Sequence, residues 1–220
     1  MTRELKFGRV AAKTGQAKSL VVFLHGYGAD GADLLGLADP LADHLPNTVF
    51  VAPDAPSPCA GNPFGRQWFP IPRFDGSSEV DAAVEMNRAA EDLNAFLDQR
   101  LADEGLTPAA LALVGFSQGA MMSLHVAPRR DQVIAGVVAI SGRLLRPQVL
   151  AQEMKVKPPV VLIHGDRDDV VPFQEMQAAG NALVAAGFDT FGHVMQGAGH
   201  GIAPDGLGVA MQFLKERLPG

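Results

Sequence analysis

The sequence predicts an α/β protein with a mostly parallel central sheet and helices on both faces. The first observation behind this prediction is a series of short runs rich in Val, Ile and Leu, each bounded by Gly, Pro, Asp or His. Such runs are apolar on both faces of a strand, which is typical of parallel strands buried between layers of helices. The second observation is that helical patterns lie between these runs, and this alternation indicates an α/β fold.

The predicted strands are spread along the whole chain. Buried strands are expected at residues 20–24, 49–52, 111–114, 133–140 and 160–163. A further run at residues 190–195 alternates polar and apolar side chains, which indicates a strand nearer the edge of the sheet.

The clearest predicted helix covers residues 78–101, where apolar side chains recur at spacings of three and four. Ser78 with Asp81 three residues later resembles a capping box, and Gly105 is a suitable end for the helix. Two weaker patterns of the same kind predict helices at residues 174–186 and 208–218.

Residues 53–75 interrupt the alternation, because they contain closely spaced prolines and no periodic pattern. We therefore predict a long ordered loop there, and loops of this length often carry function.

Composition limits the classes of partner and compartment. The chain has 220 residues and a formal net charge of −6, which predicts one domain over residues 1–220 and disfavours nucleic acid as a partner. Cys59 is the single cysteine, so an intrachain disulfide and a Cys-rich metal site are excluded. The N-terminal residues lack a secretory signal and no apolar run can span a bilayer. A cytoplasmic protein without an integral membrane segment is expected.

The strongest functional signal is at residues 115–119, which read Gly-Phe-Ser-Gln-Gly. The segment follows a predicted strand and precedes a helical stretch at residues 120–126, which is the context that a Gly-x-Ser-x-Gly nucleophile elbow requires. The same pattern also occurs in ordinary glycine-rich turns. Its position between a strand and a helix makes Ser117 the candidate nucleophile.

A serine hydroxyl is a weak nucleophile without a base, and in this type of elbow the acid and then the base follow the serine along the chain. Asp166, Asp168 and Asp169 all come directly after the strand at residues 160–163. Asp168 is favoured by its place in the middle of the turn, but the residues alone leave the choice among the three open.

His193 and His200 are the histidines that follow these acids. His193 lies within the predicted edge strand, where a structural role is expected. His200 lies between two glycines on the loop before the last helix, and this flexible backbone allows the imidazole to approach Ser117. His200 is therefore the predicted general base.

The oxyanion that forms during acyl transfer needs donors that are already in place. The backbone N–H of Gln118, directly after the nucleophile, is one expected donor. The second usually comes from the loop after an early strand, and Tyr27 is the predicted donor on that loop.

The loop that contains Tyr27 also supports an alternative function. Its sequence matches the dinucleotide-binding pattern, with Gly26, Gly28 and Gly31 at the required spacing and Asp54 at the end of the next strand. A dinucleotide-binding oxidoreductase would leave the Ser117 motif, the acidic turn and the His200 loop without explanation. A hydrolase accounts for all of them.

Taken together, these segments resemble the phospholipase/carboxylesterase family of α/β-hydrolases, which includes the acyl-protein thioesterases. The most specific matches are the Phe-Ser-Gln stretch and the pattern His-Gly-x-x-Asp-x-x-Val-Pro at residues 164–172. The remaining matches, in the order of the family, are residues 24–30, 52–53, 68–69, 141–142 and 199–200.

The resemblance implies an α/β-hydrolase fold in which Ser117 is the nucleophile, Asp168 the acid and His200 the base, with Tyr27 and Gln118 as oxyanion donors. It implies hydrolysis of short- to medium-chain carboxylic esters or thioesters through an acyl-enzyme, with no metal or organic cofactor. Small-molecule esters, acyl-thioesters, acylated proteins and lysophospholipids are the implied substrates. The sequence leaves a homodimer open.

Trp68 and Phe69 are expected to line the substrate pocket, because a proline-rich loop has little structural reason to carry aromatic residues. Met121, which follows the nucleophile motif, is a further candidate for the pocket, although packing in the core below the elbow is favoured for it. Members of the family often have an acid shortly after the aromatic pair and a second glycine at position 120, where this chain has Ala120. Hydrolysis of lactones or small peptides, and a hydrolase fold that binds without catalysis, remain alternative functions.

Overall fold

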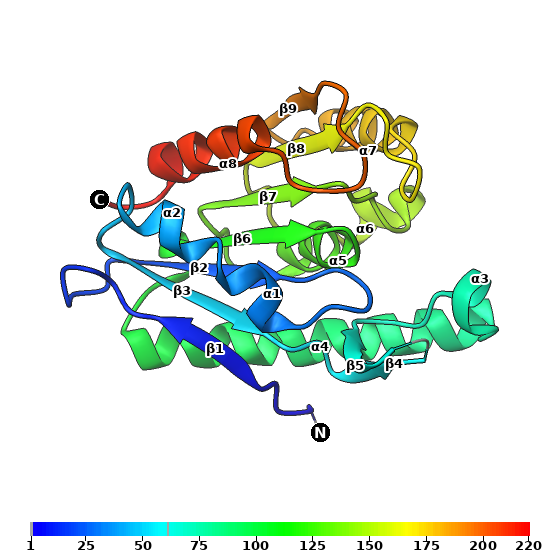
Figure 1. Ribbon diagram of the computed structural model, residues 1–220, viewed down its shortest axis with the longest axis horizontal. Helices are drawn as coiled ribbons and strands as arrows, with labels where there is room; N and C mark the ends of the chain where they lie inside the picture. Colours follow the sequence, from blue (N-terminus) through cyan, green and yellow to red (C-terminus); the bar gives the residue numbers. More distant parts are fainter. Residues whose placement is uncertain (1, 61) are drawn as a thin grey trace.

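A computed structural model describes residues 2–60 and 62–220 of the chain (Figure 1). The strands are β1 (Phe7–Val10), β2 (Ser19–Leu24), β3 (Thr48–Pro53), β4 (Ser57–Cys59), β5 (Asn62–Gln67), β6 (Leu111–Phe116), β7 (Gly136–Ile140), β8 (Val160–Gly165) and β9 (Thr190–Met195). The main sheet has 7 strands in the order β1-β3-β2-β6-β7-β8-β9. β1 is antiparallel to β3, whereas the other neighbouring pairs are parallel, as the sequence predicts.

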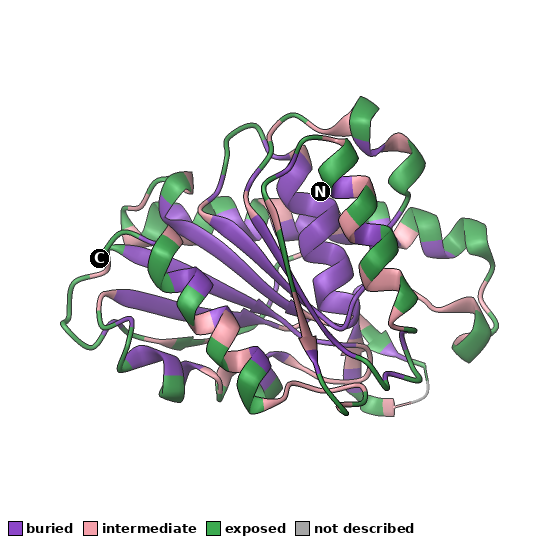
Figure 2. Cartoon of the chain, turned by 90° about the horizontal axis from the view of Figure 1, so that it is seen from above, coloured by how far each residue is buried: buried purple, intermediate pink, exposed green. Residues whose placement is uncertain are grey.

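Helices cover both faces of the main sheet, which also agrees with the prediction (Figure 1). They are α1 (Gly31–Leu35), α2 (Ala38–Ala42), α3 (Pro72–Asp75), α4 (Glu79–Glu104), α5 (Gln118–Val126), α6 (Leu150–Glu153), α7 (Gln174–Ala185) and α8 (Pro204–Arg217). Leu41 and Phe213 of α2 and α8 belong to the core on one face, and Leu93 and Leu183 of α4 and α7 to the core on the other. Figure 2 shows the strands between these two layers as buried.

α4 begins and ends where the sequence indicates. The Ser78 hydroxyl accepts a hydrogen bond from the backbone N–H of Asp81 at 3.0 Å, which satisfies one of the free donors of the first turn. Gly105 follows the last turn in the left-handed conformation with φ 66°, and its N–H bonds back to the helix.

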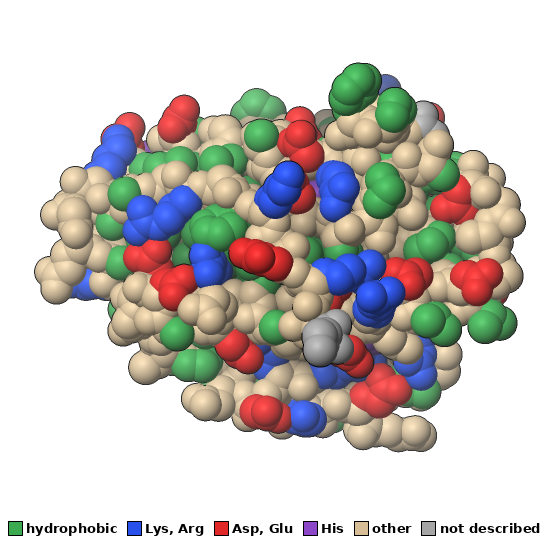
Figure 3. All heavy atoms as spheres, turned by 90° about the horizontal axis from the view of Figure 1, so that it is seen from below, with side chains coloured by type: hydrophobic (Ala, Val, Ile, Leu, Met, Phe, Trp, Pro, Cys, Tyr) green, Lys and Arg blue, Asp and Glu red, His purple; other side chains and the backbone are tan. Residues whose placement is uncertain are grey.

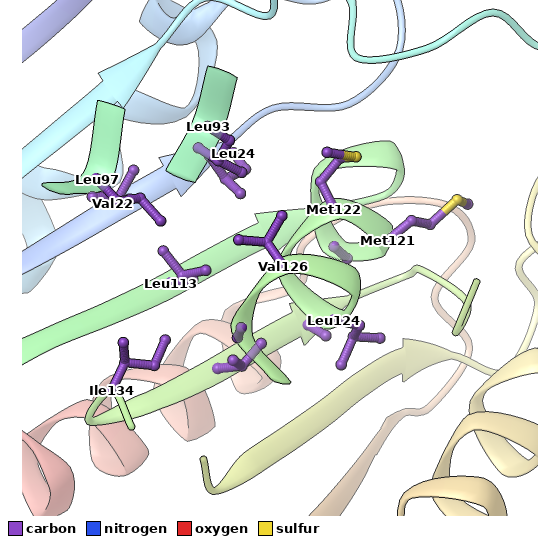
Figure 4. Packing of buried hydrophobic residues seen from close by; sticks show 14 of the residues in the cluster. Val22, Leu24, Leu93, Leu97, Leu113, Met121, Met122, Leu124, Val126 and Ile134 are labelled. Carbon is purple, nitrogen blue, oxygen red and sulfur yellow. The ribbon is translucent and has the colours of Figure 1, made fainter. Parts of the chain in front are cut away.

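α5 is buried along its whole length. Figure 4 shows Met122, Leu124 and Val126 of this helix among side chains from neighbouring strands and from α4. Because full burial of a side chain of this size contributes about 1.5–3 kcal/mol, these contacts hold α5 firmly on the sheet. The residue that precedes α5 is therefore held in a fixed place.

The prediction of a long loop at residues 53–75 is wrong in part. The segment contains the hairpin of β4 and β5, which forms its own 2-stranded sheet, and the short helix α3. These strands carry prolines and few alternating apolar side chains, so their pattern does not resemble a strand of the main sheet.

The structure also differs from the prediction near the two ends of the chain. β1 was not predicted, because an edge strand with exposed and half-buried residues carries no run of apolar side chains. α8 begins at Pro204 instead of residue 208, since proline is well suited to the first turn of a helix.

The face of the molecule seen from below in Figure 3 carries basic and acidic side chains close together. Arg9 with Glu104 and Arg3 with Glu85 and Asp92 form ion pairs between the N-terminal segment and α4. Among the described residues, no helix has the length and apolar character needed to cross a membrane.

His125 lies near the end of α5, where 3% of its surface is exposed. Burial, together with the nearby positive charge of Arg129, lowers the pKa of His125 to about 4. The folded protein therefore holds this imidazole neutral in mildly acidic solution, whereas the unfolded chain protonates it.

We predict that His125 makes the protein less stable as the pH falls from 6.5 to 4. In this window the unfolded state binds the proton and the folded state does not, so the free energy of unfolding falls by up to about 3 kcal/mol. His125→Asn should lose less stability than the wild type between pH 7 and pH 4.5 in urea titrations. His44→Asn, a change at an exposed histidine, serves as control, and equal pH dependence of all three proteins would contradict the prediction.

Candidate active site

Ser117 lies at the sharp turn between β6 and α5, with φ 53° and ψ −116°. A residue with a side chain rarely adopts a positive φ, and the strain is about 1–3 kcal/mol. The Ser117 N–H donates to the carbonyl of Ile140 at 2.9 Å, and its own carbonyl accepts from Met121 N–H at 3.1 Å. These bonds to β7 and α5 hold the serine in its strained conformation.

Both glycines of the Ser117 motif are required by the packing of the turn. A Cβ on Gly115 would overlap the backbone of Gly119, and a Cβ on Gly119 would overlap the carbonyl of Leu24 in β2. The motif thus reflects close approach of backbone to backbone on both sides of Ser117, which is the geometry that a nucleophile elbow requires.

His200 stands between Ser117 and Asp168. It comes from the loop between β9 and α8, and its ring lies against Phe116 with 4.9 Å between the ring centroids. Nε2 lies 3.0 Å from the Ser117 hydroxyl oxygen, and Nδ1 lies 2.8 Å from Oδ2 of Asp168. A carboxylate only accepts hydrogen bonds, so Nδ1 carries the proton and Nε2 is free to accept one from Ser117.

Asp168 is the aspartate that the fold brings to the histidine. Its Oδ1 accepts hydrogen bonds from the backbone N–H groups of Val170 at 3.0 Å and Val171 at 2.9 Å. Burial acts to raise the pKa of Asp168, but the hydrogen bond with His200 and those from the two N–H groups outweigh it and bring the pKa below its ordinary value. The side chain is therefore held as a carboxylate.

The two competing aspartates lie elsewhere. Asp166 and Asp169 are exposed, and Asp166 accepts a hydrogen bond from Gly197 N–H at 2.7 Å. Neither forms a hydrogen bond with His200 within the part of the chain that the structure describes, whereas Asp168 does.

Sequence reasoning missed His164. Its Nε2 lies 2.8 Å from the carbonyl of Val171 and 3.3 Å from Oδ2 of Asp168. Since a carbonyl only accepts, Nε2 carries the proton, and this N–H also faces the carboxylate. The spacing of four residues between His164 and Asp168 at the end of a buried strand was the signal that could have revealed the contact.

Tyr27 and Gln118 line the same cleft as Ser117 and His200. A Cβ on Gly26 would lie 3.3 Å from the Cβ of Ser117, so the loop after β2 passes directly beside the nucleophile. Gln118 is the first residue of α5, where backbone N–H groups have no partner within the helix. Within residues 2–60 and 62–220, the N–H groups of Tyr27 and Gln118 form no hydrogen bond with another residue.

The cleft at Ser117 has a volume of about 840 Å³ and a largely apolar wall. Phe69 and Met121, two of the three expected pocket residues, are part of this wall. Further apolar side chains come from α3, α4 and the segment after β7, namely Phe74, Met86, Leu144 and Leu145.

The expectation that Trp68 lines the pocket is wrong. Its side chain is fully buried and belongs to the core on the side of the sheet that carries α4 and α5. Its indole N–H donates to the carbonyl of His25 at 3.0 Å. A buried tryptophan needs such a partner, and Trp68 is not among the residues that line the cleft.

In the glycine-rich loop after β2, the N–H groups of Gly28 and Gly31 are not free to bind a dinucleotide. Gly28 N–H donates to the carbonyl of Arg66 in β5, and the carboxylate of Asp54 accepts from Gly31 N–H. The groups that would hold a pyrophosphate and a ribose are thus used within the protein. Among the described residues, no group of three or more His, Cys, Asp or Glu is placed to hold a metal ion.

Comparison with known proteins gives the same picture. A model of the phospholipase/carboxylesterase family matches residues 6–218. Acyl-protein thioesterase 1 of Saccharomyces cerevisiae is 32% identical over 96% of this chain and 97% of its own. Esterase YpfH of Escherichia coli K12 is 27% identical over 92% of this chain and 84% of its own.

Solved structures agree with this match. The crystal structure of esterase PE8 has a TM-score of 0.93 and 45% identity, covering 98% of this chain and 100% of the other. Acyl-protein thioesterase 2 of Zea mays has a TM-score of 0.78 and 26% identity, covering 97% and 99%. With the family model matched along most of its length, the chain belongs to the phospholipase/carboxylesterase family of α/β-hydrolases.

Proposed function

We propose that this protein hydrolyses carboxylic esters or thioesters with short- to medium-chain acyl groups, and that Ser117, His200 and Asp168 are its catalytic triad. The observation that carries the proposal is the chain of hydrogen bonds from Asp168 through His200 to Ser117, which ends at an apolar cleft. Ester or thioester hydrolysis is the activity for which the relatives of this family are named.

The geometry supports a two-step reaction. Nε2 of His200 takes the Ser117 proton as Oγ attacks the substrate carbonyl, and the N–H groups of Tyr27 and Gln118 stabilise the oxyanion. The same histidine protonates the leaving alcohol or thiol. It then activates the water that releases the acid from the acyl-enzyme. Asp168 keeps the proton on Nδ1. Nε2 is therefore free to accept a proton at the start of both acylation and deacylation.

The wall of the cleft supports an acyl group as the part of the substrate that is bound. Phe69, Met86, Met121 and Leu145 are apolar and line the space next to Ser117. Burial of each additional methylene of a linear acyl chain would contribute about 0.8 kcal/mol, which favours a chain over an acetyl group. The same cleft would take the acyl part of a small ester, an acylated protein or a lysophospholipid.

Three further properties are part of the proposal. Residues 1–220 form a single domain, which is supported by a sheet that includes strands from Phe7 to Met195. The protein is expected in the cytoplasm and acts on a small or protein-bound acyl group without a metal or organic cofactor. The sequence leaves a homodimer open.

We expect a fluorophosphonate to add once, at Ser117, because it reacts with serines that a neighbouring base activates. Intact mass and peptide mapping would locate the adduct. Ser117→Ala should remain unlabelled and lose about 10⁴- to 10⁶-fold in kcat for a p-nitrophenyl ester. An adduct elsewhere, or none on folded protein, would contradict the proposal, and a panel of esters, a thioester, an anilide and a lactone would identify the bond that is cleaved.

We predict that Asp168→Asn lowers kcat by about 10²- to 10⁴-fold with little change in KM, because the amide no longer fixes the tautomer of His200. Since the pKa of Asp168 lies below its ordinary value of about 3.9, the carboxylate stays ionised at every pH above that value. The loss is therefore measured at pH 8, where the carboxylate of the wild type is fully ionised. Asp169→Asn is the matched control, and full activity of Asp168→Asn would reject the assignment.

A further inference from the structure

Trp68 and the side chain of Gln118 form a buried link between the two walls of the cleft beside Ser117. The carboxamide oxygen of Gln118 accepts a hydrogen bond from the backbone N–H of Trp68 at 2.8 Å, and the carboxamide nitrogen donates to the carbonyl of Phe69 at 2.7 Å. Trp68 is 0% exposed and Gln118 is 1% exposed. Both ends of the carboxamide are thus satisfied, and α5 is bonded directly to the segment that follows β5.

The indole of Trp68 extends this link to the loop after β2. Its N–H donates to the carbonyl of His25 at 3.0 Å, two residues before Tyr27. His25 is itself fixed, since Nε2 accepts from Ala55 N–H at 2.9 Å and Nδ1 then donates to the carbonyl of Gly26 at 2.8 Å. Burial, opposed in part by the bond to Gly26, lowers the pKa of His25 and keeps this ring neutral.

The same loop is held on its other side by β5. Gly28 N–H donates to the carbonyl of Arg66 at 2.9 Å, and Arg66 N–H donates to the carbonyl of Ala29 at 2.8 Å. Gly65 lies so close to the carbonyl of Gly28 that a Cβ would overlap it. Residues 65–68 therefore contact both the loop that contains Tyr27 and the first residue of α5.

We infer that Trp68 and the Gln118 carboxamide are positioning residues that set the distance between the N–H groups of Tyr27 and Gln118. The Tyr27 N–H lies on the loop whose His25 carbonyl accepts a hydrogen bond from the Trp68 indole. The Gln118 N–H belongs to the residue whose side chain accepts a hydrogen bond from the Trp68 backbone. Donors to an oxyanion act by being in place before the reaction, so this link affects the transition state rather than the bound substrate. The inference rests on the proposed ester hydrolysis at Ser117.

Two variants test the link. Trp68→Phe removes the indole N–H and keeps an aromatic ring, and Gln118→Met removes the carboxamide and keeps the backbone N–H and much of the volume. Each should lower kcat for a p-nitrophenyl ester by about 10- to 100-fold, somewhat less than the effect of deleting an oxyanion donor, with KM unchanged. The second variant carries the test if the first does not fold.

Inhibitor binding separates positioning from a loss of stability. An alkylboronic acid accepts the Ser117 oxygen at boron, while the serine proton passes to His200, and so forms a tetrahedral adduct that resembles the intermediate. Its Ki should rise by the same factor as kcat falls. The Ki of an alcohol of equal chain length, which binds only the cleft, should not change.

Thr48→Val is the matched control, because it breaks the buried hydrogen bond of 2.8 Å between Thr48 and Ser19. These residues begin β3 and β2, at the end of the strands opposite to Ser117. It should lower Tm and leave kcat and the boronic acid Ki as in the wild type. The inference is overturned if Trp68→Phe and Gln118→Met behave like this control while fluorophosphonate labels the wild type at Ser117. If the wild type is not labelled, the proposed function fails first, and the inference with it.

Discussion

The strained backbone of Ser117 is the constraint on which the rest of the structure depends. A positive φ at a residue with a side chain persists only where the surroundings fix it. Here the surroundings are the buried helix α5, the hydrogen bond to Ile140 and two glycines that allow backbones to meet. A larger residue at Gly119 would push α5 away from β2 and separate Ser117 from the loop of Tyr27.

Parallel strands explain why residues distant in sequence meet at Ser117. β2, β6, β8 and β9 all run in the same direction, so the segments after them leave the sheet at one edge. These segments carry Tyr27, Ser117, Asp168 and His200 in that order. The sheet thus acts as a frame, and the segments that follow its strands present the polar groups of the site.

Structural features that depend on residues close together in the sequence could be predicted from it. Buried strands need apolar residues on both faces, and the turn at Ser117 needs its glycines, so both leave a clear pattern. β5 is held by hydrogen bonds of Arg66 with Gly28 and Ala29 on a distant loop, and Trp68 bonds to His25, 43 residues away. Such partners have no local signature, which is why the hairpin, the place of Trp68 and the contact of His164 with Asp168 required the structure.

The separation of the proposed nucleophile from its proposed base has a consequence for synthesis of the chain. Ser117 and His200 are 83 residues apart, and the histidine lies on the loop just before the last helix. During translation, Ser117 leaves the ribosome well before His200, and a serine without a base is a poor nucleophile. Under the proposed mechanism, a chain that lacks the segment from β9 to α8 would hold Ser117 without its base and would not hydrolyse esters.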